Sequence, residues 1–433
     1  MKSKDNKFNI LEKALEEYLY LLEAQLQAFP IVKKSMESLI NANLNKIIKY
    51  VKQNNIPTDR EKGAQLTEEH VKPFMSLTHN FTHSISAEKL YNRNIIVTFI
   101  SIYDYFLSDI IRAIYKIQPD FINSCGNKEI SVARLLKASS INELKNDIIT
   151  DEVDNILRGN HDSQIKWFET KLKLPLKENI SKYDDFIEIT ERRNLFVHSN
   201  GKISSQYIKN CDGKYLISEK GNLKIGDKLE ADENYIRKAY HLLVEIGVII
   251  TQLLWRNIGG KEELENADRS LVQIIFKLLK EKQYYLAKTL SSFATNPKHK
   301  SCNNEYTIIK RINKALAFYL NGEKEESNKI IESYDWSGLD KKYQLAILVL
   351  KENKEEVIEL MKSIGKNDDF KEMYREWPIF RPLRNDKEFI ETFESIYNEP
   401  LEVYEVTPIT WNEYKDYIKD PQKFFKEYMI QTP

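Results

Sequence analysis

The chain has 433 residues, which is enough for two or three domains, and 42% of them are hydrophobic, which is enough to form a sizeable core. Its 65 Lys and Arg residues balance 65 Asp and Glu residues, so no overall charge draws it to nucleic acid or to an acidic membrane. Any nucleic-acid function must therefore come from a local site.

The three cysteines, Cys125, Cys211 and Cys302, are far apart and odd in number. This usage is typical of a reduced intracellular protein without disulfides or a CxxC metal site. Acidic residues interrupt the first apolar stretch, which argues against a signal peptide. The most apolar window, residues 242–255, is too short to span a bilayer and contains Glu245. We expect a cytoplasmic protein that does not enter membranes.

Gly and Pro are sparse, and apolar residues recur with helical spacing, so we expect an all-α fold. In the N-terminal segment, residues 1–87, the pattern predicts a helix over 8–28 that stops before Pro30. A second helix is expected over 31–53. After a polar loop, a shorter helix is expected over 67–80.

Residues 88–258 form the second predicted domain, a helical bundle. It opens with a long, strongly apolar helix over 88–117, which we expect to lie at the centre. A β-hairpin insertion is expected at about 202–230, where Tyr, Ile and Leu alternate with Gly-containing turns. The remaining helices are expected at about 128–138, 141–158, 161–171, 181–198 and 232–257.

Gly259 and Gly260 read as a boundary to a C-terminal domain, residues 261–433. Its pattern is similar to tetratricopeptide-like helix pairs, although no strict 34-residue period is present. We therefore expect a helical-repeat domain. Its helices are expected at 262–280, 283–295, 304–321, 324–333, 339–352 and 354–364, with another within 371–398 and two aromatic-rich pieces in the last thirty residues.

The sequence ITERRNLFVHSNG, residues 189–201, places polar residues inside an apolar helical pattern. We expect this helix to begin at Ser181 as N-cap and to end at Asn200 and Gly201. Asn194 and His198 then share one face, whereas Arg193 lies about 140° from His198 around the helix axis. The guanidinium and the imidazole can meet only through the length of the arginine side chain or through a second copy of the helix.

These residue types are suited to cleaving RNA without a metal. The imidazole of His198 can take or give a proton near neutral pH, and Arg193 can stabilise charge on a phosphate. Asn194 can orient either group. The expected products are a 2′,3′-cyclic phosphate and a 5′-hydroxyl. No cofactor or metal is expected.

The segment from Arg193 to His198 resembles the RxxxxH signature of HEPN domains, in which Asn commonly follows Arg. The resemblance spans about residues 88–258, with 101–115 similar to the first core helix. It implies a helical bundle that dimerises so that two motifs form one ribonuclease site, with roles in toxin–antitoxin and phage-defence systems. The polar residue that the family places on the first core helix corresponds to Ser101 or Asp104, and Arg192 is a further supporting candidate.

Three other interpretations stay open. Arg192 and Arg193 could be solvated while His198 caps its own helix. A HEPN-like fold could bind RNA or nucleotide without cutting it. The helical domains could also act as a non-catalytic scaffold for other proteins. The expected partners are RNA, a second copy of the chain, and a protein or antitoxin bound through the C-terminal helices.

Two other patterns give weaker indications of function. His79 and His83 have the spacing of metal ligands on a helix, but no neighbouring carboxylate or cysteine completes a site, so a surface pair is favoured. The stretch GNLKIGDK lacks the spacing of a phosphate-binding loop, which argues against a P-loop nucleotide hydrolase.

Overall fold

The computed structural model describes residues 7–59, 63–125, 130–211, 217–218, 221–336 and 338–403. Over these residues the fold is all-α with two very short β-hairpins, which confirms the expected fold class. The aromatic-rich pieces expected in the last thirty residues lie outside the described residues.

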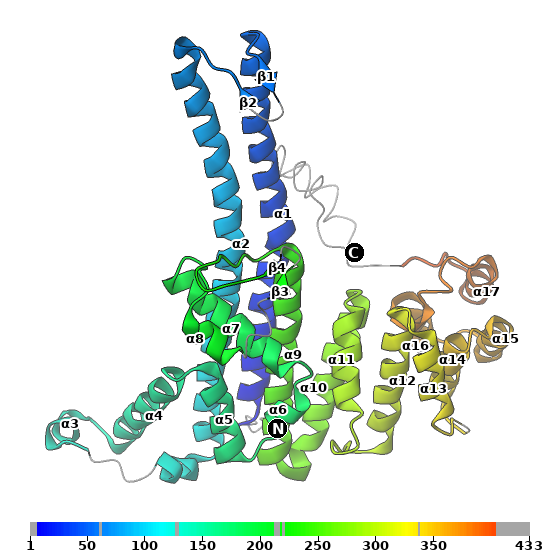
Figure 1. Ribbon diagram of the computed structural model, residues 1–433. Helices are drawn as coiled ribbons and strands as arrows, with labels where there is room; N and C mark the ends of the chain where they lie inside the picture. The colour runs from blue at the N-terminus through cyan, green and yellow to red at the C-terminus, as the bar shows by residue number, and fades with distance from the viewer. Residues whose placement is uncertain are drawn as a thin grey trace.

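Two long helices, α1 (Asn9–Gln53) and α2 (Glu68–Ile117), form an antiparallel hairpin whose far end projects beyond the rest of the protein (Figure 1). The expected break at Pro30 is wrong, because α1 runs through it. Pro30 lies on the exposed side of the helix, where water can satisfy the freed carbonyl, and its neighbour Phe29 is fully buried. The gap expected between 80 and 88 is also helical. The short hairpin β1 (Thr58–Asp59) and β2 (Gly63–Ala64) lies in the connection.

The core lies where α1 and α2 meet α9 (Glu233–Ile258). Every residue of α9 from Leu242 to Trp255 is buried, so the most apolar window of the sequence is a core helix. By length and composition α2 could cross a membrane, but half of its most apolar stretch is buried inside the protein, as in a core helix. The boundary expected between residues 87 and 88 falls within α2, and α1 packs into the same core as the bundle.

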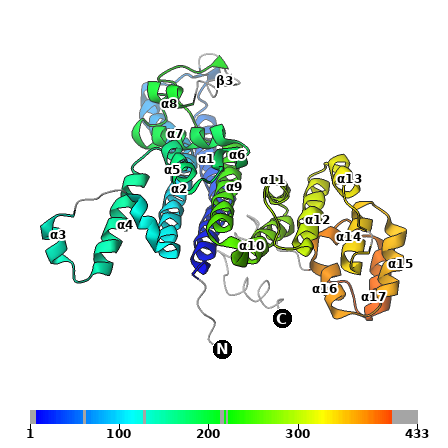
Figure 2. The same cartoon turned by 90° about the horizontal axis from the view of Figure 1, so that it is seen from below.

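Short helices cover the base and one flank of this core (Figure 2). The helix expected over 181–198 is α7 (Tyr183–His198), and the hairpin expected within 202–230 is β3 (Ile217–Ser218) paired with β4 (Gly221–Asn222). Two short helices of this region, α6 and α8, were not expected from the sequence. The other elements of this region are η1 (Pro119–Cys125), α3 (Val132–Lys137), α4 (Ile141–Leu157), α5 (His161–Leu172), α6 (Leu176–Asn179) and α8 (Ser205–Asn210).

The C-terminal helices extend to the other side of the bundle as successive pairs (Figure 2). The first six lie close to the helices expected from the sequence, whereas two α-helices occupy the region where one was expected within 371–398. The pairs do not start at even intervals. They are α10 (Gly260–Lys280), α11 (Tyr284–Ala294), α12 (Asn304–Leu320), α13 (Lys324–Glu332), α14 (Lys341–Leu350), α15 (Lys354–Ile364), α16 (Asp368–Glu376), η2 (Pro378–Phe380) and α17 (Lys387–Tyr397).

A buried carboxylate connects the bundle to these pairs. Asp268 of α10 is fully buried and accepts hydrogen bonds from Arg256 of α9 and Lys310 of α12. Burial opposes ionisation of this carboxyl, but the two cations hold its pKa below the usual range. Ion pairs therefore hold α9, α10 and α12 together around the junction at Gly259 and Gly260, so this junction is not a flexible linker.

Gly247 lets α1 approach α9 closely. A Cβ at this position would lie 2.3 Å from the Tyr18 ring, which stacks on Phe106 at 4.3 Å and donates its hydroxyl to the Leu243 carbonyl at 2.9 Å. The ring is buried and held at both ends, so it has no room to move away.

We therefore expect Gly247→Ala to lower the free energy of unfolding by about 1–3 kcal/mol through overpacking. Helix propensity alone would give the opposite sign, a gain of up to about 1 kcal/mol. Urea denaturation measures the difference. A stability equal to or above that of the wild type would show that α1 does not pack on α9 in this way.

Candidate functional site

Helix α7 carries the motif and is fixed at both ends. Its expected N-cap, Ser181, is wrong: α7 begins after Lys182, and Ser181 instead donates its amide and hydroxyl to Glu245 of α9, at 2.7 and 3.0 Å. The expected C-terminus is confirmed. Asn200 and Gly201 adopt φ of 50° and 78°, and the Ser199 and Gly201 amides both donate to the Leu195 carbonyl.

A residue that the sequence analysis missed, Arg93 of α2, holds the turn after His198 in place. Its side chain is nearly buried and donates two hydrogen bonds to Glu230, at 2.8 and 2.9 Å. A third, of 2.8 Å, goes to the Asn200 side chain. Gly201 packs closely against the neighbouring backbone, since a Cβ at this position would lie 2.9 Å from the Leu229 carbonyl. The chain leaving His198 is therefore rigidly placed.

The side chain of Arg192 belongs to a hydrogen-bond network that holds helices together. Its Nε donates to Glu188 at 2.6 Å, its Nη1 donates to the Glu230 carbonyl at 3.1 Å, and its guanidinium lies 4.0 Å from the centre of the Tyr235 ring. Glu188 also accepts from the hydroxyls of Tyr207 and Tyr235, at 2.7 and 2.8 Å. This network connects α7 to α8 and α9, so Arg192 is not free to bind a ligand.

Arg193 points the other way, toward α2 and α5. Its Nη2 donates to Asp104 at 2.7 Å, and its Nη1 donates to the Asn194 side chain at 3.2 Å. The second oxygen of Asp104 lies 3.0 Å from Nε2 of His161, the first residue of α5. The buried Nε of Arg193 has no hydrogen-bond partner among the described residues. One carboxylate thus bridges a guanidinium and an imidazole from two other helices.

The structure separates the two polar candidates on α2. Asp104 contacts Arg193, whereas Ser101 is exposed and donates its hydroxyl to Val97 within its own helix at 2.9 Å. His198 is exposed in the last turn of α7, and its side chain makes no hydrogen bond within the described part of the chain. A single chain therefore brings together Arg193, Asn194, Asp104 and His161, and leaves His198 apart.

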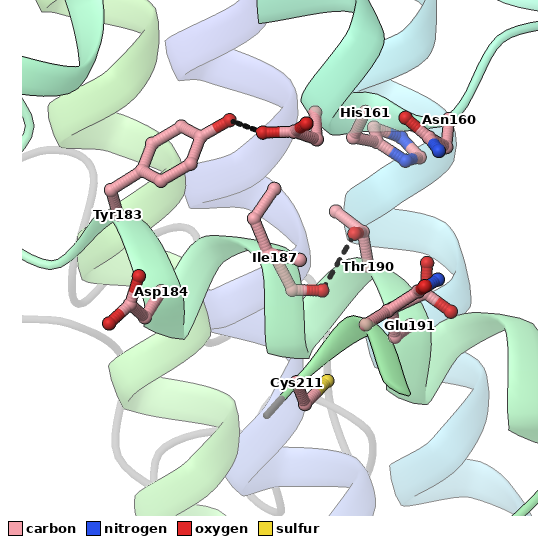
Figure 3. Close-up of a pocket in the computed structure, with 10 residues that line it drawn as sticks. Asn160, His161, Tyr183, Asp184, Ile187, Thr190, Glu191 and Cys211 are labelled. Carbon is pink, nitrogen blue, oxygen red and sulfur yellow. Dashed lines mark hydrogen bonds between the residues drawn. The ribbon is translucent and has the colours of Figure 1, made fainter. Parts of the chain in front are cut away.

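A pocket of about 260 Å³ lies beside this cluster, between the start of α5, α7 and the end of α8. Figure 3 shows His161, Thr190 and Glu191 on one side of it and Tyr183 and Asp184 on the other. His161 is shared, because it lines the pocket and also holds Asp104. The pocket and the Arg193 guanidinium are therefore close together, with only the His161 imidazole and the Asp104 carboxylate between them.

Asp162 anchors the floor of the pocket. It lies within 2.9 Å of the Lys166 and Lys177 ammonium groups and accepts a hydrogen bond of 2.7 Å from the Tyr183 hydroxyl. Burial alone would raise the pKa of this carboxyl, but these three partners outweigh it and lower the pKa to about 2. Asp162 therefore stays ionised at any physiological pH and is already satisfied.

No group of three or more potential metal ligands occurs among the described residues. The His79 and His83 rings are 4.0 Å apart on the exposed side of α2. Comparisons with protein families, with curated proteins and with solved structures gave no match to this chain.

Because the pKa of Asp162 is lower in the folded chain than the unfolded value of about 3.9, its interactions stabilise the protein above pH 4 and are lost as the pH falls toward 2. We expect Asp162→Asn to cost about 1–2 kcal/mol at pH 7, allowing for partial exposure, and progressively less in acid. Urea titrations between pH 7 and 2.5 measure this, with the exposed Asp369→Asn as control. An unchanged difference across this range would contradict the assignment.

Proposed function

We propose that this protein is a metal-independent endoribonuclease in which Arg193 stabilises the phosphate, Asn194 orients it and His198 transfers a proton. The observation that carries the proposal is the placement of Arg193. Its guanidinium is fixed by Asp104 and Asn194, which use two of its five N–H groups, and its side chain is about one-fifth exposed. A fixed, partly exposed guanidinium is suited to stabilising charge that develops on a phosphate.

The proton-transfer group in this proposal comes from a second copy of the chain. Within one chain His198 lies about 140° from Arg193 on α7, but it is exposed and its position is rigid because Arg93 holds the following turn. Two α7 helices facing each other would bring each His198 toward the opposite Arg193. The resemblance to HEPN domains supports the same arrangement, and with it a cytoplasmic role as a toxin or phage-defence effector.

Purified protein is expected to cleave total RNA in the presence of EDTA. His198→Ala should slow cleavage by about 10²–10⁴-fold, the usual contribution of a general acid or base. Arg193→Lys should also slow it strongly, because lysine keeps the charge but lacks the planar fork. Gel analysis of the RNA measures both.

Matched controls are His83→Ala and Arg237→Ala, which change an exposed histidine and an exposed arginine far from α7 in sequence. Both should cleave like the wild type. Cleavage that survives His198→Ala, or that requires a divalent metal, would refute the proposed mechanism.

The two-copy arrangement makes a separate prediction. Val197 is 49% exposed beside His198, so an acidic side chain there would lie between the facing α7 helices. We expect Val197→Glu to convert a dimer to a monomer in analytical ultracentrifugation and to abolish cleavage. A monomeric wild type that is nevertheless active would contradict the shared site.

A second candidate function, a scaffold for other proteins, has one specific observation in its favour. A groove of about 760 Å³ lies between α10, α12, α14 and α16, and the half-exposed side chains of Phe276, Met373 and Trp377 line it. Such a groove could bind a protein partner or an antitoxin. An inactive wild type, together with a bound protein that Met373→Asp releases, would favour this function.

A further inference from the structure

The pocket beside Arg193 is lined by a carboxylate side chain that has no partner among the described residues. Glu191 of α7 is only 8% exposed and lines the pocket, yet it makes no hydrogen bond or ion pair within the described residues. Its carboxylate oxygens are not enclosed by protein and face the open space of the pocket. Two neighbouring carboxylates are compensated, Asp162 by two lysines and Asp104 by Arg193. A largely buried side chain whose unpartnered oxygens face a pocket is suited to a ligand that donates hydrogen bonds to it.

The other lining groups narrow the chemistry of that ligand. Asn160 and Asn210 use their carbonyl oxygens within the chain, accepting from the Ser163 amide and the Gln206 side chain at 2.8 Å each. The NH₂ end of each amide is then the end that can donate to a ligand. Tyr183 adds an aromatic ring fixed by its hydroxyl bond to Asp162, and Ile187 adds an apolar surface. The pocket thus combines an anionic acceptor, neutral donors and a flat ring.

A guanine base matches this combination. Its Watson–Crick edge presents a ring N–H and an amino group side by side, which can donate to the two oxygens of one carboxylate, and its O6 and N7 accept hydrogen bonds. Single-stranded RNA is commonly read in this way, with an unstacked base placed against an aromatic side chain. Ligand pockets generally span about 300–1,000 Å³, and one base is smaller than a drug-sized ligand, so about 260 Å³ is a reasonable volume.

The position of the pocket also fits a nucleotide. His161 lines the pocket and lies 3.0 Å from Asp104, whose other oxygen accepts from Arg193 at 2.7 Å. A base in the pocket would therefore lie near Arg193, with His161 and Asp104 between the two. We propose that this pocket is a guanine-binding subsite, with Glu191 as the residue that selects the base. The inference rests on the proposed ribonuclease function for its biological use, but base binding can be measured without cleavage.

The test is calorimetric titration of the full chain with guanosine, inosine and uridine 5′-monophosphates. Inosine lacks only the amino group of guanosine, and uridine lacks it as well as the purine ring. We expect guanosine monophosphate to bind at least tenfold more tightly than either, and Glu191→Gln to remove that preference. Glu178→Gln, an exposed glutamate of α6 that pairs with Lys298, is the matched control and should leave the preference intact. Circular dichroism verifies that each variant is folded.

Equal binding of the three nucleotides, no saturable binding of guanosine monophosphate, or an undiminished preference in Glu191→Gln would overturn the proposal. The outcome of this test can be distinguished from the outcome for the proposed ribonuclease activity. Selective binding by a wild type that cleaves no RNA would keep the guanine pocket and reject the ribonuclease. Cleavage by a wild type that binds all three nucleotides alike would do the reverse.

Discussion

The candidate site depends on the two contacts that the Asp104 carboxylate makes, one with Arg193 and one with His161. One of its oxygens accepts from Arg193 of α7, and the other lies within hydrogen-bond distance of His161 of α5. Side chains of the three helices α2, α5 and α7 thereby meet at one point. Partly buried charge-assisted hydrogen bonds of this kind fix geometry more than they add stability, because desolvation offsets much of the attraction. Their value here is that a guanidinium is held in one orientation beside a pocket.

Much of the fold could be predicted from hydrophobic periodicity. The C-terminal helix pairs, α7 and α9 all lie close to their expected ranges because each has an amphipathic or apolar pattern bounded by Asn, Gly or polar turns. The errors in the longest elements lie in the hairpin α1–α2. Pro30 and the polar stretch after residue 80 suggest interruptions locally, but packing of two long helices along each other outweighs those preferences. Tertiary packing of this kind has no signature in a short window of sequence.

The candidate site was predictable only where its residues share one helix. Arg193, Asn194 and His198 fall in a single motif, and helical geometry already indicated that Arg193 and His198 could meet only through the length of the arginine side chain or through a second copy of the helix. Asp104 and Ser101 could be separated only with the fold, since both lie on α2 within one turn. Arg93 and His161 gave no signal at all, because Arg93 contacts Asn200 from a helix distant in sequence and His161 is connected to Arg193 through Asp104. Helical periodicity cannot show which distant side chains a bundle brings together.

The central claim is that RNA is cut by attack of its own 2′-hydroxyl, with protein side chains and no metal. The most direct measurement uses a short RNA with a single 2′-deoxy nucleotide at a site of cleavage, incubated with the protein in EDTA and analysed by mass spectrometry. The account predicts that cleavage is lost at the deoxy position alone and that the products elsewhere end in a 2′,3′-cyclic phosphate and a 5′-hydroxyl. Cleavage after the deoxy nucleotide, or products with a 5′-phosphate, would contradict it.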